Sequence, residues 1–349
     1  MVQLPQQVGG NEIPLPRRKW IAMARLGMLV AVLALIAWYV AAHAEDFRKL
    51  GNVSWTSLAA ALGLDALTYL YGAAAIVLTV HLFGTRLGTM EAMLLSLLTR
   101  LGNLLLPLRG GAVVRAVYLN RTHGLSYADF LAGLSAMLFS TLAGSLLCAL
   151  GGLAWIAATT GETFPKVTLV LAGALVAVSL TVVLRPRIGS SQGDAVDAGL
   201  AEAGTNKARI KIILDRLRGH IQRLLDSYHL VSRHRPSLLG LLAVSGLQIL
   251  TMAGIYALLL AAMGKPAGLG MLIVIVALAN VSTVVPLTPG NVGVYEGILA
   301  LLGHLVGLVA PDILAASLAW RALDTALILI TGPISSYVLT GKAFYRSRA

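Results

Sequence analysis

The chain has little cysteine and few charged residues, and each shortage excludes certain kinds of site or classes of protein. Cys148 is the only cysteine among 349 residues, so neither a disulfide framework nor a cysteine metal site can form within one chain. Only 12% of the residues are charged, about half the share in ordinary soluble domains, whereas 57% are hydrophobic. These values exclude a soluble globular protein.

Sequence motifs of enzyme chemistry are missing as well. The chain has no nucleotide-binding loop, no paired-acid metal motif, no zinc-ligand spacing and no serine nucleophile elbow. We therefore expect no cofactor and no metal, and the residues favour a transporter over an enzyme. The net charge of +12 would indicate nucleic acid in a soluble chain, but in this composition we attribute it to membrane topology and expect no nucleic-acid partner.

The chain contains several apolar runs of about 18 residues or more, and each is long enough to cross the ~30 Å hydrocarbon core as a helix. They predict an all-α, polytopic membrane protein. Six runs are uninterrupted and predict full transmembrane helices at 20–40, 58–83, 127–158, 167–184, 238–263 and 313–339.

Two further apolar runs are broken. The run at 92–108 holds polar residues and ends on Pro107, and the run at 269–309 is interrupted by prolines and glycines midway. Non-helical backbone at membrane depth is tolerated only where it lines a cavity or is buried in protein. Each broken run therefore predicts a re-entrant hairpin beside a binding site.

The positive charges predict the orientation of this membrane domain, 20–341. With two hairpins, 21 of the 27 Lys and Arg residues lie on the face that holds both termini, which the positive-inside rule makes cytoplasmic. The halves 20–158 and 167–341 then repeat one element order in opposite orientations, a pseudo-inverted repeat of the kind found in transporters.

Three polar segments complete the predicted organisation. Residues 1–19 and 342–349 form basic tails. The cytoplasmic loop 186–236 holds a basic amphipathic pattern at 208–231, which we expect to lie on anionic lipid headgroups.

The first broken run supplies one set of candidate substrate-binding residues: Arg100, Asn103, Pro107, Arg109, Gly111 and Arg115. Proline and glycine let the chain turn back, and Arg109 and Arg115 flank the turn with planar donors that suit a phosphate. The alternative is that both arginines only anchor the hairpin to headgroups. Arg100 lies inside an apolar segment, where a charge usually faces a partner or water.

The second broken run supplies the other set: Asn280, Pro286, Pro289, Gly290, Gly293 and Glu296. The glycines leave backbone N–H groups exposed at a helix N-terminus, which favours an anion. Glu296 is an intramembrane carboxylate, expected to face an arginine, a cationic headgroup or a proton; the alternative is a structural ion pair or cap.

Three more charged residues lie inside apolar helices and are candidates for ion pairing or coupling. Arg321 and Asp324 are three residues apart, a spacing that predicts a local pair on one helix face. Asp65 lies in the second predicted helix.

Together, the two broken segments resemble the lysylphosphatidylglycerol synthase transmembrane-region family, also called flippase-like membrane proteins. The resemblance covers Trp20 to Thr340 and implies a multi-pass protein of the bacterial cytoplasmic (inner) membrane. Some members add a soluble aminoacyltransferase domain, expected to be absent here, and their membrane part is held to move the lipid product across the bilayer. This chain departs from the family pattern at Ala112, often acidic, and at Asn291, often glycine.

The leading hypothesis is a translocator that moves a phospholipid, an aminoacyl-lipid or an isoprenoid-linked lipid between leaflets. Two alternatives stay open: a membrane-embedded transferase acting on a polyprenyl-phosphate or phospholipid, and a non-catalytic partner of a lipid synthase. Either a homodimer or a synthase partner is compatible with the sequence.

Overall fold

The computed structural model describes residues 53–106, 110–183, 235–284, 288, 291, 293–305 and 308–346. The chain divides into residues 1–44 and 45–349, and every described residue belongs to the second unit. The predicted helix at 20–40, the loop 186–236 and the tail at 1–19 fall outside the described residues, apart from Arg235 and Pro236, which begin a helix.

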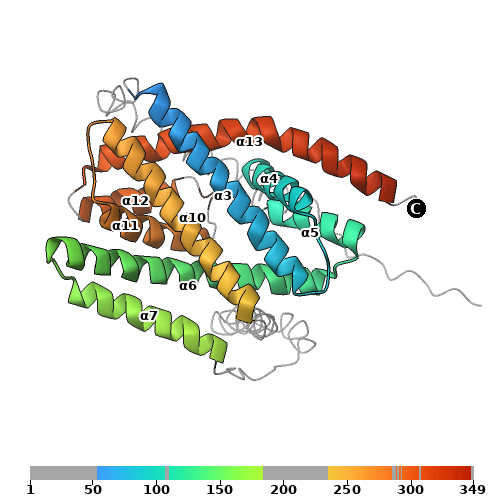
Figure 1. The fold of residues 1–349 in the computed structure, drawn as a ribbon, viewed down its shortest axis with the longest axis horizontal. Helices are drawn as coiled ribbons and strands as arrows, with labels where there is room; N and C mark the ends of the chain where they lie inside the picture. The colour runs from blue at the N-terminus through green and yellow to red at the C-terminus, as the bar shows by residue number, and fades with distance from the viewer. Residues whose placement is uncertain are drawn as a thin grey trace, which may run out of the picture. The chain divides into compact units, whose positions relative to one another are not determined.

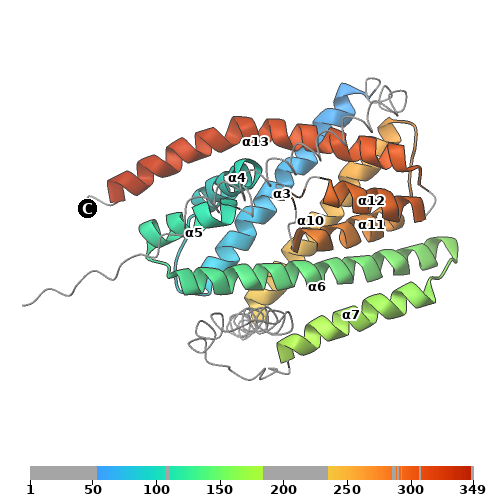
Figure 2. The same ribbon diagram turned by 180° about the vertical axis from the view of Figure 1, so that it is seen from behind.

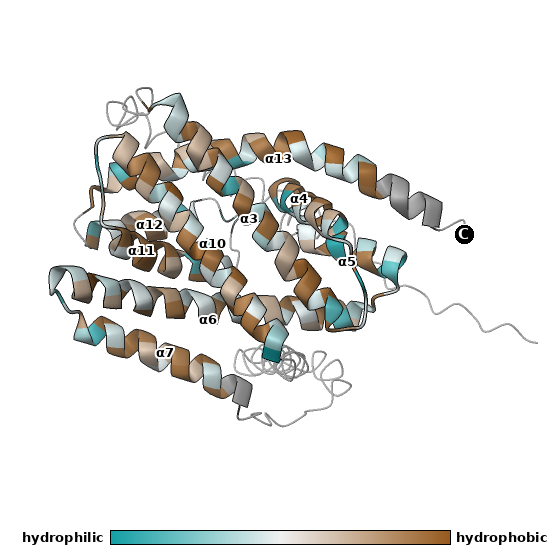
Figure 3. Ribbon diagram, in the orientation of Figure 1, coloured by the Kyte–Doolittle hydropathy of each residue, from teal (hydrophilic) through white to brown (hydrophobic). Residues whose placement is uncertain are grey.

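Within the described residues, four long helices are apolar enough to cross a membrane: α3 (Trp55–His81), α6 (Tyr127–Thr160), α10 (Arg235–Ala262) and α13 (Ala310–Arg346, apolar as far as Leu339). Each coincides with a predicted crossing. Large apolar side chains are exposed on their outer faces, such as Trp155 at 56% and Ile330 at 65%, a pattern typical of a surface that contacts lipid. Figure 3 shows hydrophobic residues recurring along α3, α10 and α13.

The remaining described helices are shorter: α4 (Thr89–Leu105), α5 (Gly110–His123), α7 (Pro165–Val183), α11 (Leu269–Val281), the 3₁₀ turn η2 (Ser282–Val284) and α12 (Val294–Leu305). Helix α7 matches the crossing predicted at 167–184, although only 165–180 forms its described apolar part. Every regular element in the described ranges is helical, which confirms the all-α prediction.

Both predicted breaks occur where proline and glycine interrupt the sequence. Helix α4 ends at Leu105, and Leu106 is extended with ψ 138°, the conformation that a following proline imposes on the residue before it. The second break separates η2, which ends at Val284, from α12, which begins at Val294. The local chemistry of these residues therefore fixes where the helix of each broken run is interrupted.

Helices α4 and α5 are neighbours (Figure 1), and their contacts show that they form an antiparallel hairpin. At its open end, Glu91 Oε1 of α4 accepts hydrogen bonds from Tyr118 OH at 2.5 Å and from His123 Nε2 at 2.9 Å, both on α5. At its turn, a Cβ added to Gly102 would lie 2.6 Å from the Cα of Gly111. The two backbones touch at that point because neither residue has a side chain.

The long helices cross in fixed relative directions. Gly240 and Gly254 of α10 face Leu78 and Leu64 of α3, so this pair is antiparallel. Helices α6 and α7 lie side by side in both views, as do α3 and α10 (Figures 1 and 2). In addition, α4 packs on α3 and α13, whereas α11 packs on α10 and α6.

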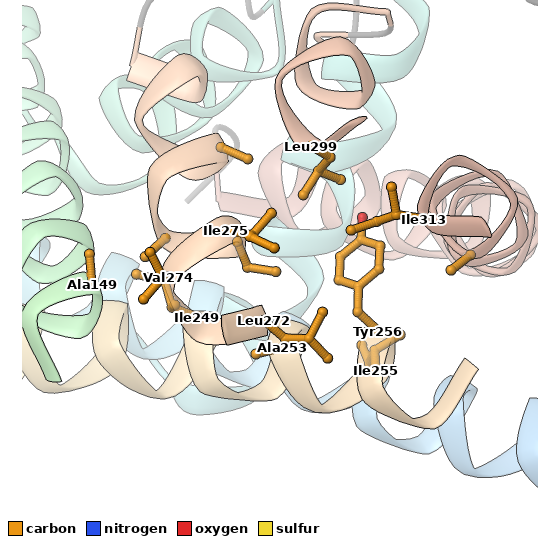
Figure 4. Packing of buried hydrophobic residues seen from close by; sticks show 14 of the residues in the cluster. Ala149, Ile249, Ala253, Ile255, Tyr256, Leu272, Val274, Ile275, Leu299 and Ile313 are labelled. Carbon is orange, nitrogen blue, oxygen red and sulfur yellow. The ribbon is translucent and has the colours of Figure 1, made fainter. Parts of the chain in front are cut away.

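The main apolar core lies where α10, α11, α12 and α13 meet. Tyr256 of α10, Leu272 of α11 and Leu299 of α12 are fully buried there, and Figure 4 shows them converging with Ile313 of α13. A second cluster, which includes Ile76, Leu95 and Leu119, joins α3, α4 and α5. These two clusters hold the broken segments between the long helices.

Candidate functional site

A cavity of about 300 Å³ lies among α4, α10, α11, α13 and the segment between α11 and α12. Apolar side chains such as Ile249, Met252 and Val276 form part of its wall. The rest carries charge, amides, hydroxyls and aromatic rings: Arg100, Asn103, Gln248, Asn280, Thr283, Thr288, Asn291, Tyr295, Trp320, Arg321 and Asp324.

Five residues predicted from sequence meet on this cavity. Arg100 and Asn103 come from the first broken segment and Asn280 from the second, about 180 positions further along the chain. Arg321 and Asp324 come from α13. The structure therefore brings side chains of the two broken segments to one site.

Arg100 is held by three residues of α3 and α13. Its Nη1 donates to Asp324 Oδ1 at 3.1 Å, and its Nη2 donates to Thr68 Oγ1 at 2.7 Å. The guanidinium also lies 4.1 Å from the ring centroid of Tyr69, whose hydroxyl donates to the same Asp324 oxygen at 2.6 Å. A partly buried cation is thus neutralised by a carboxylate and covered on one face by an aromatic ring.

Glu296 forms the second ion pair of the site. Its Oε1 accepts from Arg321 Nε of α13, and its Oε2 accepts from the backbone N–H of Gly293 at 2.7 Å. The latter bond closes the first turn of α12, as in a capping box. Of the partners considered from sequence, Glu296 therefore has an arginine and a helix cap.

The expected local pair between Arg321 and Asp324 is replaced by two longer-range pairs. Arg321 binds Glu296 of α12, and Asp324 binds Arg100 of α4. Both pairs join α13 to one of the broken segments. The tertiary arrangement overrides the i, i+3 spacing because each side chain meets an opposite charge on a neighbouring helix.

The segment before α12 is organised around Asn291. Its φ is +56°, in the left-handed region that glycine or asparagine tolerates best, which explains why glycine often occupies this position in the family that the sequence resembles. The Nδ2 of Asn291 donates to Ser282 Oγ at 3.0 Å. Its Oδ1 is buried and has no hydrogen-bond partner among the described residues.

We expect Asn291→Val to lower the thermal unfolding temperature of the purified protein, whereas Asn291→Gly leaves it near the native value. A β-branched residue in the left-handed region costs roughly 1–2 kcal/mol, and glycine adopts that region freely. Differential scanning fluorimetry in detergent would measure both. Equal unfolding temperatures for the two variants would contradict the strained backbone.

Asn103 and Gly111 have structural roles in the first hairpin. Asn103 Oδ1 accepts from the backbone N–H of Gly111 at 3.1 Å, and this bond satisfies an N–H in the first turn of α5. Gly111 packs against α4. Asn103 lines the cavity as well, so it serves both the hairpin and the site.

Arg115 lies away from the cavity, and the structure does not join it to the site as a phosphate rim. It is buried on α5, where its guanidinium lies 5.3 Å from the ring centroid of Phe130 of α6. It borders a separate small pocket together with Asp129. The other predicted residues of the turns, Pro107, Arg109, Pro286, Pro289 and Gly290, are outside the described residues.

Asp65 lies behind the cavity on α3. It is fully buried, and its Oδ1 accepts from the indole N–H of Trp320 at 3.0 Å. Trp320 itself lines the cavity, with tilted rings of Tyr256 and Tyr295 beside it at centroid distances of 6.3 and 6.4 Å. The sequence singled out Asp65 but gave no indication of its partner.

Sequence reasoning missed Gln248, Tyr295 and Trp320 as members of the site. Gln248 had a detectable signal, since it is an amide in the middle of an apolar helix. Tyr295 and Trp320 had none, because aromatic residues in apolar segments are ordinarily core residues. In the described part of the chain, no group of three His, Cys, Asp or Glu side chains is placed to hold a metal ion.

Comparison with known proteins agrees with the helical architecture. The family described as lysylphosphatidylglycerol synthase TM region matches residues 25–332, which is most of the chain and includes both broken segments. The chain belongs to this family. It is accordingly a multi-pass membrane protein of a lipid-related family. Neither a curated protein nor a solved structure matches the sequence.

Proposed function

We propose that this member of the lysylphosphatidylglycerol synthase TM region family is a lipid translocator whose headgroup site is the cavity described above. The observation that carries the proposal is the meeting of both broken segments on one polar cavity inside an apolar helix bundle. Its volume is at the lower end of the ~300–1,000 Å³ typical of ligand sites. It suits a lipid headgroup, while the acyl chains stay in the bilayer.

The cavity chemistry supports a headgroup that carries a phosphate and further polar groups. The bonds to Asp324 and Thr68 use two of the five N–H groups of Arg100, and a guanidinium can bind a phosphate through two parallel N–H groups. Gln248 on the cavity wall supplies an amide oxygen that can accept from a hydroxyl or ammonium group. Arg100 replaces Arg115 in the phosphate-binding role expected from sequence.

We also propose a pseudo-inverted repeat of six full crossings and two re-entrant hairpins, with both termini cytoplasmic, in a bacterial cytoplasmic membrane. Helix pairing supports it. The contacts of Asp65 and Tyr69 with Trp320 and Asp324 run parallel along α3 and α13, and those of Gly144 and Cys148 with Ser245 and Gly246 run parallel along α6 and α10. An inverted repeat requires that the helix contacts stay the same when equivalent helices of the two halves are exchanged. This holds for the exchange of α3 with α10, α4 with α11 and α6 with α13.

Filling the cavity tests the proposal. We expect Met252→Trp, which adds volume to the cavity wall on α10, to reduce lipid movement at least tenfold. Leu250→Trp is the matched control because Leu250 lies on the same helix with its side chain 47% exposed, and it should move lipid at the native rate. The assay follows acyl-chain-labelled phosphatidylglycerol in phosphatidylcholine vesicles, quenched from outside by an impermeant reductant.

The same preparations separate translocation from the alternatives. Recovered lipid should be chemically unchanged by mass spectrometry; an altered headgroup would replace the proposal with a transferase. Vesicles with native protein that quench no faster than empty vesicles, for phosphatidylglycerol and for phosphatidylethanolamine, would contradict translocation of phospholipids.

A further inference from the structure

Asp65 is a buried carboxyl group that the proposed headgroup site does not use. Its side chain lies entirely inside the protein, and only Oδ1 has a hydrogen-bond donor, the indole of Trp320. Oδ2 is buried without a hydrogen-bond partner among the described residues. An ionised carboxylate in this position would keep one oxygen unsatisfied in an apolar interior, which is strongly unfavourable.

Asp324 of α13 and Arg100 of α4 are the charged groups nearest to Asp65 among the described residues, and they act in opposite directions: the like charge of Asp324 opposes ionisation of Asp65, whereas Arg100 favours it. The two carboxyl groups lie close together, because Trp320, one turn before Asp324, donates to Asp65, and Tyr69, one turn after Asp65, donates to Asp324. In the described residues, α6 and α10 also contact α3 but add no charged group to these neighbours. Two carboxyl groups therefore share one guanidinium, and that guanidinium is already bound to Asp324.

We propose that Asp65 and Asp324 form a proton-binding site, which holds one proton between them when the cavity is empty. With that proton, the two carboxyl groups and Arg100 sum to zero charge. A proton on Asp65 Oδ2 also gives this oxygen a donor to offer its neighbour, so the only unsatisfied atom of the cluster finds a partner.

The site also has a route to the cavity. Arg100, Trp320 and Asp324 line the cavity wall, and Asp65 lies directly behind Trp320. When a headgroup phosphate pairs with Arg100, Asp324 loses its cation, and the two carboxyl groups take up a second proton. One proton is then bound with each monoanionic headgroup and leaves with it, so net movement is electroneutral. This coupling step rests on the proposed translocator function, whereas the resting proton does not.

Infrared difference spectroscopy tests the resting proton without any transport. The purified native protein should show the carbonyl stretch of a buried, protonated carboxylic acid near neutral pH. Asp65→Asn should lose this band, because asparagine supplies a neutral side chain of the same shape, while Asp129→Asn, at the N-cap region of α6, should retain it. Absence of the band in native protein, or its persistence in Asp65→Asn, would overturn the proposal.

Coupling is tested in vesicles with the membrane potential clamped. A gradient of one pH unit should shift the leaflet distribution of labelled phosphatidylglycerol by about tenfold with native protein, as one-to-one co-transport of a proton with each lipid requires. Asp65→Asn should still equilibrate the lipid but ignore the gradient. Gradient sensitivity that survives in Asp65→Asn would refute the coupling while leaving translocation intact, and absence of lipid movement by native protein would refute the proposed function.

Discussion

Gly111→Ala should prevent the α4–α5 hairpin from closing and should be among the most damaging single substitutions in this protein. A Cβ at position 111 would overlap the backbone carbonyl oxygen of Thr99, and it would also lie 2.8 Å from Asn103 Oδ1. A rotating side chain could yield, but a helix carbonyl cannot. Overpacking typically costs ~1–3 kcal/mol, and we expect at least the upper end of that range here.

The measurement is the thermal unfolding temperature and monodispersity of detergent-purified protein. Gly151→Ala on α6 is the matched control, because a Cβ there meets nothing within 4 Å. In a helix interior this change should be neutral or stabilising by roughly 0.5–1 kcal/mol. If Gly111→Ala unfolds at the temperature of Gly151→Ala, the close backbone contact is wrong.

The Gly111→Ala substitution should also affect the cavity. The hairpin carries Arg100 and Asn103 to the cavity, and the packing of Gly102 against Gly111 fixes its crossing. Loss of this contact should therefore remove lipid movement together with stability. The sequence of the first broken run indicates a phosphate-binding turn. In the structure, Gly111 of this run acts through backbone packing instead.

Arg321→Met should be strongly destabilising because it leaves the Glu296 carboxylate inside the protein without its cation. The Glu296 side chain is only 6% exposed, and removing one partner of a buried pair costs about 3–5 kcal/mol. Adding Glu296→Gln to Arg321→Met should restore most of the lost stability. Glutamine is neutral and keeps an acceptor for the backbone N–H of Gly293.

Lys265→Met supplies the control for an exposed pair. Lys265 lies 4.0 Å from Asp312 with its side chain 50% exposed, so its loss should cost less than ~1 kcal/mol. Chemical denaturation in detergent would rank the variants. A double variant as unstable as Arg321→Met alone would show that the uncompensated charge is not the cause.

The two proposals make different demands on the same cavity. Headgroup binding needs the open volume and the remaining donors of Arg100, whereas proton binding needs only the pair of Asp65 and Asp324. For this reason Met252→Trp should reduce lipid movement at least tenfold without affecting the infrared band. Asp65→Asn should remove the infrared band without stopping lipid movement. Opposite responses of this kind would assign the two functions to separate groups.

The sequence by itself determined the class of protein and the positions of the breaks. Uninterrupted apolar runs predict long helices because lipid leaves backbone groups no other partner, and α3, α6, α10 and α13 follow those runs. Pro107 and the prolines and glycines at 286–293 end or delay helices through local sterics. Charges placed inside apolar runs, such as Arg100 and Glu296, identified polar sites for the same reason.

Only the tertiary structure decided which of these groups meet. Sequence spacing paired Arg321 with Asp324, grouped Arg115 with the phosphate site and left Asp65 without a partner. In the folded chain α13 crosses α4 and α12, so Asp324 pairs with Arg100 and Arg321 pairs with Glu296. The packing of α5 on α6 directs Arg115 away from the cavity. Spacing along one helix describes neighbours on that helix alone, whereas a buried charge binds whatever opposite charge the packing of other helices brings within reach.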